Sequence, residues 1–89
     1  MGNENYKKLG IIGGLGPAAT ATLFARVIDL TEAETDQDHL DITILNRPQT
    51  PDRTAFILGK SDESYLPPLH EAALELEDFG CEVLATPCV

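Results

Sequence analysis

The sequence predicts an α/β fold: a three-layer β-α-β-α-β unit around a parallel sheet. Three short apolar runs, at residues 9–12, 42–45 and 81–86, have the composition of buried parallel strands. Each of the two segments between them is long enough for a crossover and carries an apolar stripe at helical spacing. Because such crossovers are right-handed, we expect the first strand to lie between the other two.

The first strand, residues 9–12, leads into the glycine-rich segment 13–16. Pro17 then suits the first position of a helix, where its missing N–H group does no harm. We expect this helix to end near residue 30 or 31. Its core-facing stripe consists of Leu23, Phe24, Val27 and Ile28.

An acidic connector at residues 32–41 precedes the second strand at residues 42–45, which is rich in β-branched side chains. The two prolines of residues 46–54 predict a loop. A short helical turn at residues 55–58 and a polar loop at residues 59–64 follow.

The second helix has an apolar face and is followed by Gly80, which suits a helix cap at its carboxyl end. Residues 81–86 predict the third strand. We therefore divide the chain into a polar leader, residues 1–8, and one α/β domain, residues 9–89. The expected core face of the helix comprises Leu66, Leu69, Ala73, Leu76 and Phe79.

The last predicted strand lies at the end of the sequence, so we expect an open sheet edge and an uncovered sheet face. This indicates a truncated domain, and the open edge also permits a homo-oligomer. The net charge of −9 argues against nucleic acid or an anionic membrane as a partner. Without a signal peptide or an apolar span, we expect a cytoplasmic protein, in which Cys81 and Cys88 are free thiols.

Residues 14–19 satisfy the dinucleotide pattern G-x-G-x-x-G/A between a strand and a helix. That fingerprint also requires an acidic residue at the end of the second strand, where Asn46 and Arg47 stand instead. A glycine turn at a helix amino terminus offers unpaired N–H groups and the positive end of a dipole, which bind a carboxylate as well as a phosphate.

The carboxyl ends of parallel strands meet at one edge, so three polar segments are expected to converge there. Arginine suits a bidentate grip on a carboxylate, and a thiol beside cationic groups can serve as a thiolate base. Two simpler interpretations stay open: Arg53 pairs with Asp52, and Cys88 is a small core residue. The converging residues are Gly13, Gly14, Leu15, Gly16, Asn46, Arg47, Gln49, Arg53, Thr86 and Cys88.

Four segments, residues 10–20, 36–39, 46–54 and 86–88, together resemble the aspartate/glutamate racemase family in motif, order and spacing. The resemblance implies racemisation of aspartate or glutamate without cofactor or metal, in a fold of two similar α/β halves. The chain would then be an incomplete amino-terminal half of that two-domain racemase fold. Cys88 corresponds to a catalytic cysteine and Arg53 to the arginine that engages a substrate carboxylate. The resemblance also implies substrate contacts at Asn46, Gln49, Leu15, Gly14 and Gly16.

The sequence departs from the family pattern in four respects. Val89 replaces an asparagine, Leu15 stands where methionine is common, and the second half of the fold is missing. Arg47 replaces a smaller polar residue and is a second candidate anion contact. One thiol cannot act on both faces of a stereocentre, so we expect residues 1–89 alone to be inactive. Two alternatives stay open. The first is a carboxylate-binding or assembly module without turnover, and the second is a dinucleotide-binding half-domain.

Overall fold

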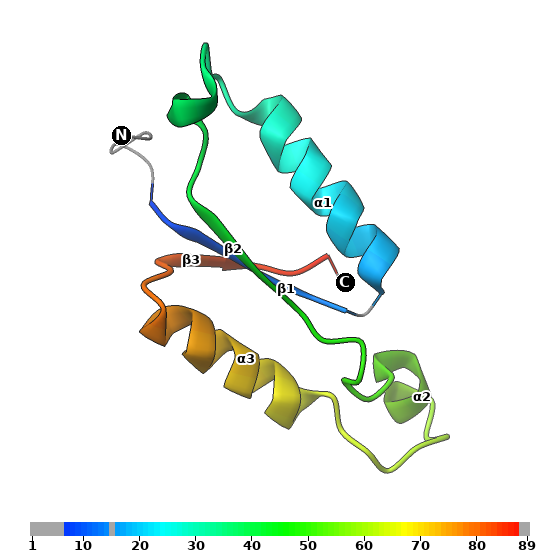
Figure 1. The fold of residues 1–89 in the computed structure, drawn as a ribbon. Helices are drawn as coiled ribbons and strands as arrows, with labels where there is room; N and C mark the ends of the chain where they lie inside the picture. The colour runs from blue at the N-terminus through cyan, green and yellow to red at the C-terminus, as the bar shows by residue number, and fades with distance from the viewer. Residues whose placement is uncertain (1–6, 15, 88–89) are drawn as a thin grey trace.

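The computed structural model describes residues 7–14 and 16–87, and in this part of the chain three parallel strands form one sheet (Figure 1). A 3-10 helix, Asp36–Asp38, lies in the acidic connector. The strands are β1 (Leu9–Gly13), β2 (Ile42–Asn46) and β3 (Val83–Ala85). The helices are α1 (Pro17–Leu30), α2 (Arg53–Ile57) and α3 (Leu66–Asp78).

The strand order is β2-β1-β3 with both pairings parallel, which confirms the predicted α/β class and the central position of the first strand. Leu9 is opposite Ile42 on one side and Val83 on the other. Helices α1 and α3 cover opposite faces of the sheet, so the unit has three layers (Figure 1). The crossover through α1 runs from β1 to β2, and the crossover through α3 returns from β2 past β1 to β3. Right-handed crossovers in opposite directions place their helices on opposite faces of the sheet.

The core is small and is centred on Ile11 of the central strand, which is fully buried. Gly10, its neighbour, faces α3: a Cβ atom there would lie 3.1 Å from both Leu76 Cδ1 and Cys81 Sγ. The absent side chain therefore lets α3 approach β1 closely. Leu76, Ala72 and Cys81 complete the buried apolar set on this side.

The predicted core face of α3 is partly wrong. Leu76 is buried as expected, but Phe79 is 71% exposed and Leu66 is 52% exposed, whereas Ala72 is buried in their place. The bare surface at Gly10 fixes which side of the helix can approach the sheet, and spacing along the helix does not encode that position.

The third strand is shorter than predicted, because Cys81 takes part in the cap that follows α3. Gly80 adopts a φ of +101° after the helix, as its expected capping role requires. The N–H of Cys81 then donates to the carbonyl of Leu76 at 2.9 Å, which closes the helix end. Strand pairing begins only at Val83 and ends at Ala85.

Helix α1 has the predicted bounds, but Phe24 and Ile28 of its expected core face are more than a third exposed. They line an open groove between α1 and the connector that leads to Ile42. Both Val83 and Leu84 are also exposed, although they alternate along β3, so the expected uncovered sheet surface is present at this strand. Within residues 7–14 and 16–87, no helix is both long and apolar enough to cross a bilayer.

Candidate functional site

The glycine turn after β1 lies directly against the loop after β2, at the carboxyl edge of the sheet (Figure 1). Gly13 is the register partner of Asn46, and the next residue, Arg47, donates its N–H to the carbonyl of Gly13 at 2.9 Å. The structure therefore brings together two of the segments that the sequence predicts to converge.

The backbone conformation and the close packing at this contact both require a glycine at the position of Gly14. Its φ is +117°, and a Cβ atom there would lie 2.3 Å from the carbonyl carbon of Arg47. The N–H of Gly14 donates to Thr20 Oγ1 at 3.2 Å, so the expectation that the N–H groups of this turn are unpaired is wrong for Gly14. Thr20, which the sequence analysis missed, is a buried polar residue whose hydroxyl also donates to Gly16 O.

Gly16 is different, because the fold has no visible need for a glycine there. It is the N-cap of α1 with φ −104°, and a Cβ atom would meet nothing within 4 Å. Open space therefore adjoins the amino terminus of a 14-residue helix. The first N–H groups of a helix have no partners within it and favour an anion, so the carboxylate contact expected at this turn stays a prediction.

The loop after β2 turns back at Pro48 and Gln49, where the N–H of Thr50 donates to the carbonyl of Arg47 at 3.2 Å. Asp52 is the N-cap of α2, and its Oδ1 accepts hydrogen bonds from the N–H groups of Thr54 and Ala55. Both Asn46 and Gln49 are exposed. The helix starts two residues earlier than expected because of this cap.

Arg53 is the first residue of α2, which lies beyond the carboxyl end of β2 (Figure 1). Its Nε atom is buried and has no hydrogen-bond partner in the part of the chain that the structure describes. The ion pairs found among these residues join Lys8 with Asp41 and Arg47 with Glu75, so the simpler interpretation that Arg53 pairs with Asp52 is wrong. An unpaired buried donor is costly, and a ligand carboxylate would remove that cost.

Arg47 points to a different partner from the one expected. Its Nη2 lies 2.5 Å from Glu75 Oε2, which links the loop after β2 to α3. Its predicted role as a second anion contact is therefore not seen in this structure, where its charge is already paired.

The end of β3 contributes the third segment. Ala85 is the register partner of Ile11, and Thr86 lines a hollow together with Ile12 of β1. The chain thus reaches the same edge at Thr86 and Pro87. Two predicted site residues, Leu15 and Cys88, lie outside the described residues.

Comparison with known proteins assigns the family. Residues 12–89 match the family model described as Asp/Glu/Hydantoin racemase. The chain belongs to this racemase family. Its structure is also similar to that of Picrophilus torridus aspartate racemase, with 34% sequence identity and a TM-score of 0.78. The match covers 91% of this chain and 54% of that one, so the chain spans about half the length of that racemase.

These findings confirm the resemblance to a racemase family and the prediction that this chain has the α/β fold of part of a racemase. In this racemase-family chain, β2 ends in Asn46 opposite the glycine turn, so the acidic residue of a dinucleotide site is absent from that position. Among residues 7–14 and 16–87, no three His, Cys, Asp or Glu side chains are grouped so that they could hold a metal ion.

Proposed function

We propose that this chain forms the amino-terminal half of an amino-acid racemase, which interconverts L and D forms of aspartate or glutamate by cofactor-independent proton transfer. Membership of the racemase family and the similarity to an aspartate racemase support the reaction class. The main structural support for the site is Arg53 at the carboxyl edge of the sheet, because the Nε of its guanidinium is buried and unpaired.

In this proposal Arg53 holds one carboxylate of the substrate. The amino terminus of α1 faces open space at Gly16 and stabilises negative charge there. Asn46 at the end of β2 and Gln49 in the loop after it are both exposed, and they supply hydrogen bonds to the bound amino acid. The resemblance to the family adds Leu15 and Gly14 to the substrate contacts of this proposal.

The proposed chemistry is a two-base proton transfer. The thiolate of Cys88 removes the α-proton from one face, and the electron pair of the C–H bond passes to the α-carbon and its carboxylate. A thiol from the other half of the fold then delivers a proton to the opposite face. General acid–base catalysis supplies about 10²–10⁴-fold, so stabilisation of the carbanionic charge by Arg53 and the α1 amino terminus must supply the rest.

The proposal requires two bases on opposite faces of the substrate, and residues 1–89 carry one of them. A polypeptide of these residues alone is therefore inactive, whereas a chimera that joins them to the carboxyl-terminal part of the Picrophilus torridus racemase forms D-aspartate from L-aspartate. Chiral chromatography measures this conversion. A chimera with Cys88→Ser serves as the control and produces no D-aspartate.

The substrate site is tested separately by alkylation of the thiols. L-Aspartate slows the reaction of Cys88 with iodoacetamide in residues 1–89, whereas L-alanine, which lacks the side-chain carboxylate, gives less protection. Cys81 is buried beneath Gly10 and serves as an internal control, which mass spectrometry of the peptides resolves. Equal labelling of Cys88 with and without L-aspartate would contradict the proposed site.

A further inference from the structure

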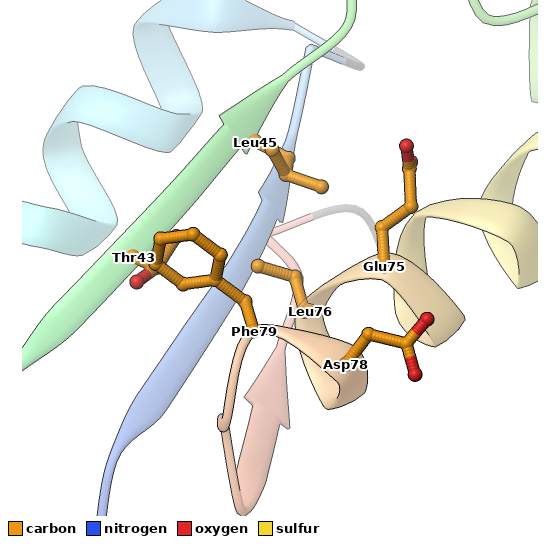
Figure 2. A pocket seen from close by; sticks show the side chains of 6 residues that line it. All are labelled: Thr43, Leu45, Glu75, Leu76, Asp78 and Phe79. Atoms are coloured by element: carbon orange, nitrogen blue, oxygen red, sulfur yellow. The ribbon is translucent and has the colours of Figure 1, made fainter.

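The segment after β2 carries two of the proposed substrate contacts, Gln49 and Arg53, and an ion pair ties its first residue to α3. That residue is Arg47, whose Nη2 lies 2.5 Å from Oε2 of Glu75. In Figure 2 the carboxylate of Glu75 extends from α3 in the direction in which β2 runs, whereas that of Asp78 points away from the sheet. The ion pair therefore joins α3 to the edge of the sheet at which the loop begins.

The backbone of Arg47 is held on the side of the sheet. Its N–H donates to the carbonyl of Gly13 at 2.9 Å, and its carbonyl carbon would lie 2.3 Å from a Cβ atom at Gly14. Its carbonyl also accepts the N–H of Thr50 at 3.2 Å, which forms the first turn of the loop. A side-chain contact of Arg47 therefore acts on the residue from which the loop takes its direction.

Glu75 belongs to a part of α3 that is anchored on the sheet. The next residue, Leu76, is 1% exposed, and its Cδ1 would lie 3.1 Å from a Cβ atom at Gly10. A close-packed contact of this kind leaves the backbone little freedom to shift. The carboxylate of Glu75 is therefore a fixed point to which the guanidinium of Arg47 is attached.

The segment around Arg53 has less support of its own. Helix α2 has five residues, fewer than an isolated helix needs, and the bonds of its N-cap stay within the segment. After Arg53, the ring of Phe56 meets the ring of Tyr65 edge to face, with centroids 6.1 Å apart, just before α3 begins. Arg53 thus lies between this ring contact and the ion pair of Arg47.

We propose that Glu75 is a positioning residue of the substrate site, because through Arg47 it holds the loop in the course that places Arg53 at the carboxyl edge. The identity of the substrate rests on the proposed function, whereas the attachment of the loop does not. The two charges are 38% and 48% exposed, so the effect on binding is modest. If Arg47 instead contacted the substrate directly, removal of the Glu75 carboxylate would free the guanidinium and strengthen binding.

The first test measures how L-aspartate protects Cys88 of residues 1–89 from iodoacetamide, which gives an apparent dissociation constant. We expect Glu75→Gln to raise this constant about two- to fivefold. Arg47→Met should raise it by a similar factor, and the double variant no further, because the two side chains act as one unit. Arg47→Lys keeps the charge and should restore part of the affinity.

Glu71→Gln is the matched control. It removes the same charge one turn earlier on α3, at an exposed position that takes part in none of the ion pairs of the described residues. Loss of a negative charge alone favours an anionic ligand, so this variant should bind L-aspartate as tightly as the wild type or more tightly.

The second test does not involve the substrate. Amide hydrogen exchange, measured by NMR, should become about two- to fivefold faster at the N–H groups of Arg47 and Thr50 in Glu75→Gln. The N–H of Cys81, which bonds the carbonyl of Leu76, should exchange as in the wild type, because it reports on α3. Glu71→Gln should change none of these rates.

The outcomes separate this proposal from the proposed function. Unchanged exchange at Arg47 and Thr50 in Glu75→Gln would overturn the positioning role. So would protection of Cys88 in that variant that equals or exceeds the wild type. If L-aspartate does not protect Cys88 in the wild type, the proposed function fails, and the exchange rates alone decide whether Glu75 holds the loop.

Discussion

Thr20 accepts a hydrogen bond from the N–H of Gly14, 3.2 Å away, and so joins the first turns of α1 to the turn that follows β1. The hydroxyl is buried, and a valine of similar shape would leave the amide of Gly14 without a partner. We expect Thr20→Val to lower the free energy of unfolding by about 1–3 kcal/mol, measured by urea denaturation. Thr22→Val is the control, because the Thr22 hydroxyl bonds only Ala18 O at an exposed position, and its effect should be within about 0.5 kcal/mol.

Gly14 and Gly59 both have positive φ angles, but only Gly14 is also packed against backbone. A methyl group at Gly59 would meet nothing within 4 Å, so Gly59→Ala should cost about 1–2 kcal/mol, from its φ of +75° alone. At Gly14 the methyl group would in addition collide with the backbone of Arg47, and Gly14→Ala should cost more than about 3 kcal/mol. Equal destabilisation in thermal unfolding would contradict the packing at this turn.

The bounds of α1 could be predicted from the sequence, because apolar spacing and the glycine–proline start of a helix are local signals. The order of the strands could be predicted because crossovers between parallel strands are right-handed. The rotation of α3 about its own axis could not be predicted from the sequence. It depends on the missing side chain of Gly10, a residue more than 50 positions away, which accommodates Leu76 and leaves Phe79 outside. Such a contact joins residues that are far apart in the sequence, so the spacing of apolar residues within one helix does not reveal it.

In the candidate site, too, some features could be predicted from the sequence and others could not. The convergence of the glycine turn and Asn46 follows from parallel strands, and the register pair of Gly13 with Asn46 confirms it. The pairing of Gly14 with Thr20 and of Arg47 with Glu75 was not predicted, since each partner lies on a helix whose orientation had first to be known. A threonine just inside the helix that follows a glycine turn is a signal that could have indicated the first pairing.

The ion pair between Arg47 and Glu75 should contribute little to stability despite its short distance. The two side chains are 38% and 48% exposed, so solvent screens their charges. A double-mutant cycle with Arg47→Met and Glu75→Gln should give a coupling free energy of about 0.2–1 kcal/mol, which decreases in high salt. The more exposed pair of Lys8 and Asp41, at 3.6 Å, is the comparison and should show weaker coupling. Stronger coupling in that pair would contradict this argument.

We expect Arg53 to contribute to binding of the substrate carboxylate and not to the free energy of unfolding. Its buried Nε has no partner in the described chain, and a methionine keeps the apolar stem while it removes that donor. We therefore expect Arg53→Met to leave the free energy of unfolding unchanged or to raise it by up to about 1 kcal/mol, although most substitutions of partly buried residues lower it. The same variant should lose the protection of Cys88 by L-aspartate. Arg26→Met on the exposed side of α1 should change neither property. A clear loss of stability in Arg53→Met, with the protection of Cys88 retained, would show that Arg53 holds the loop together and does not bind a carboxylate.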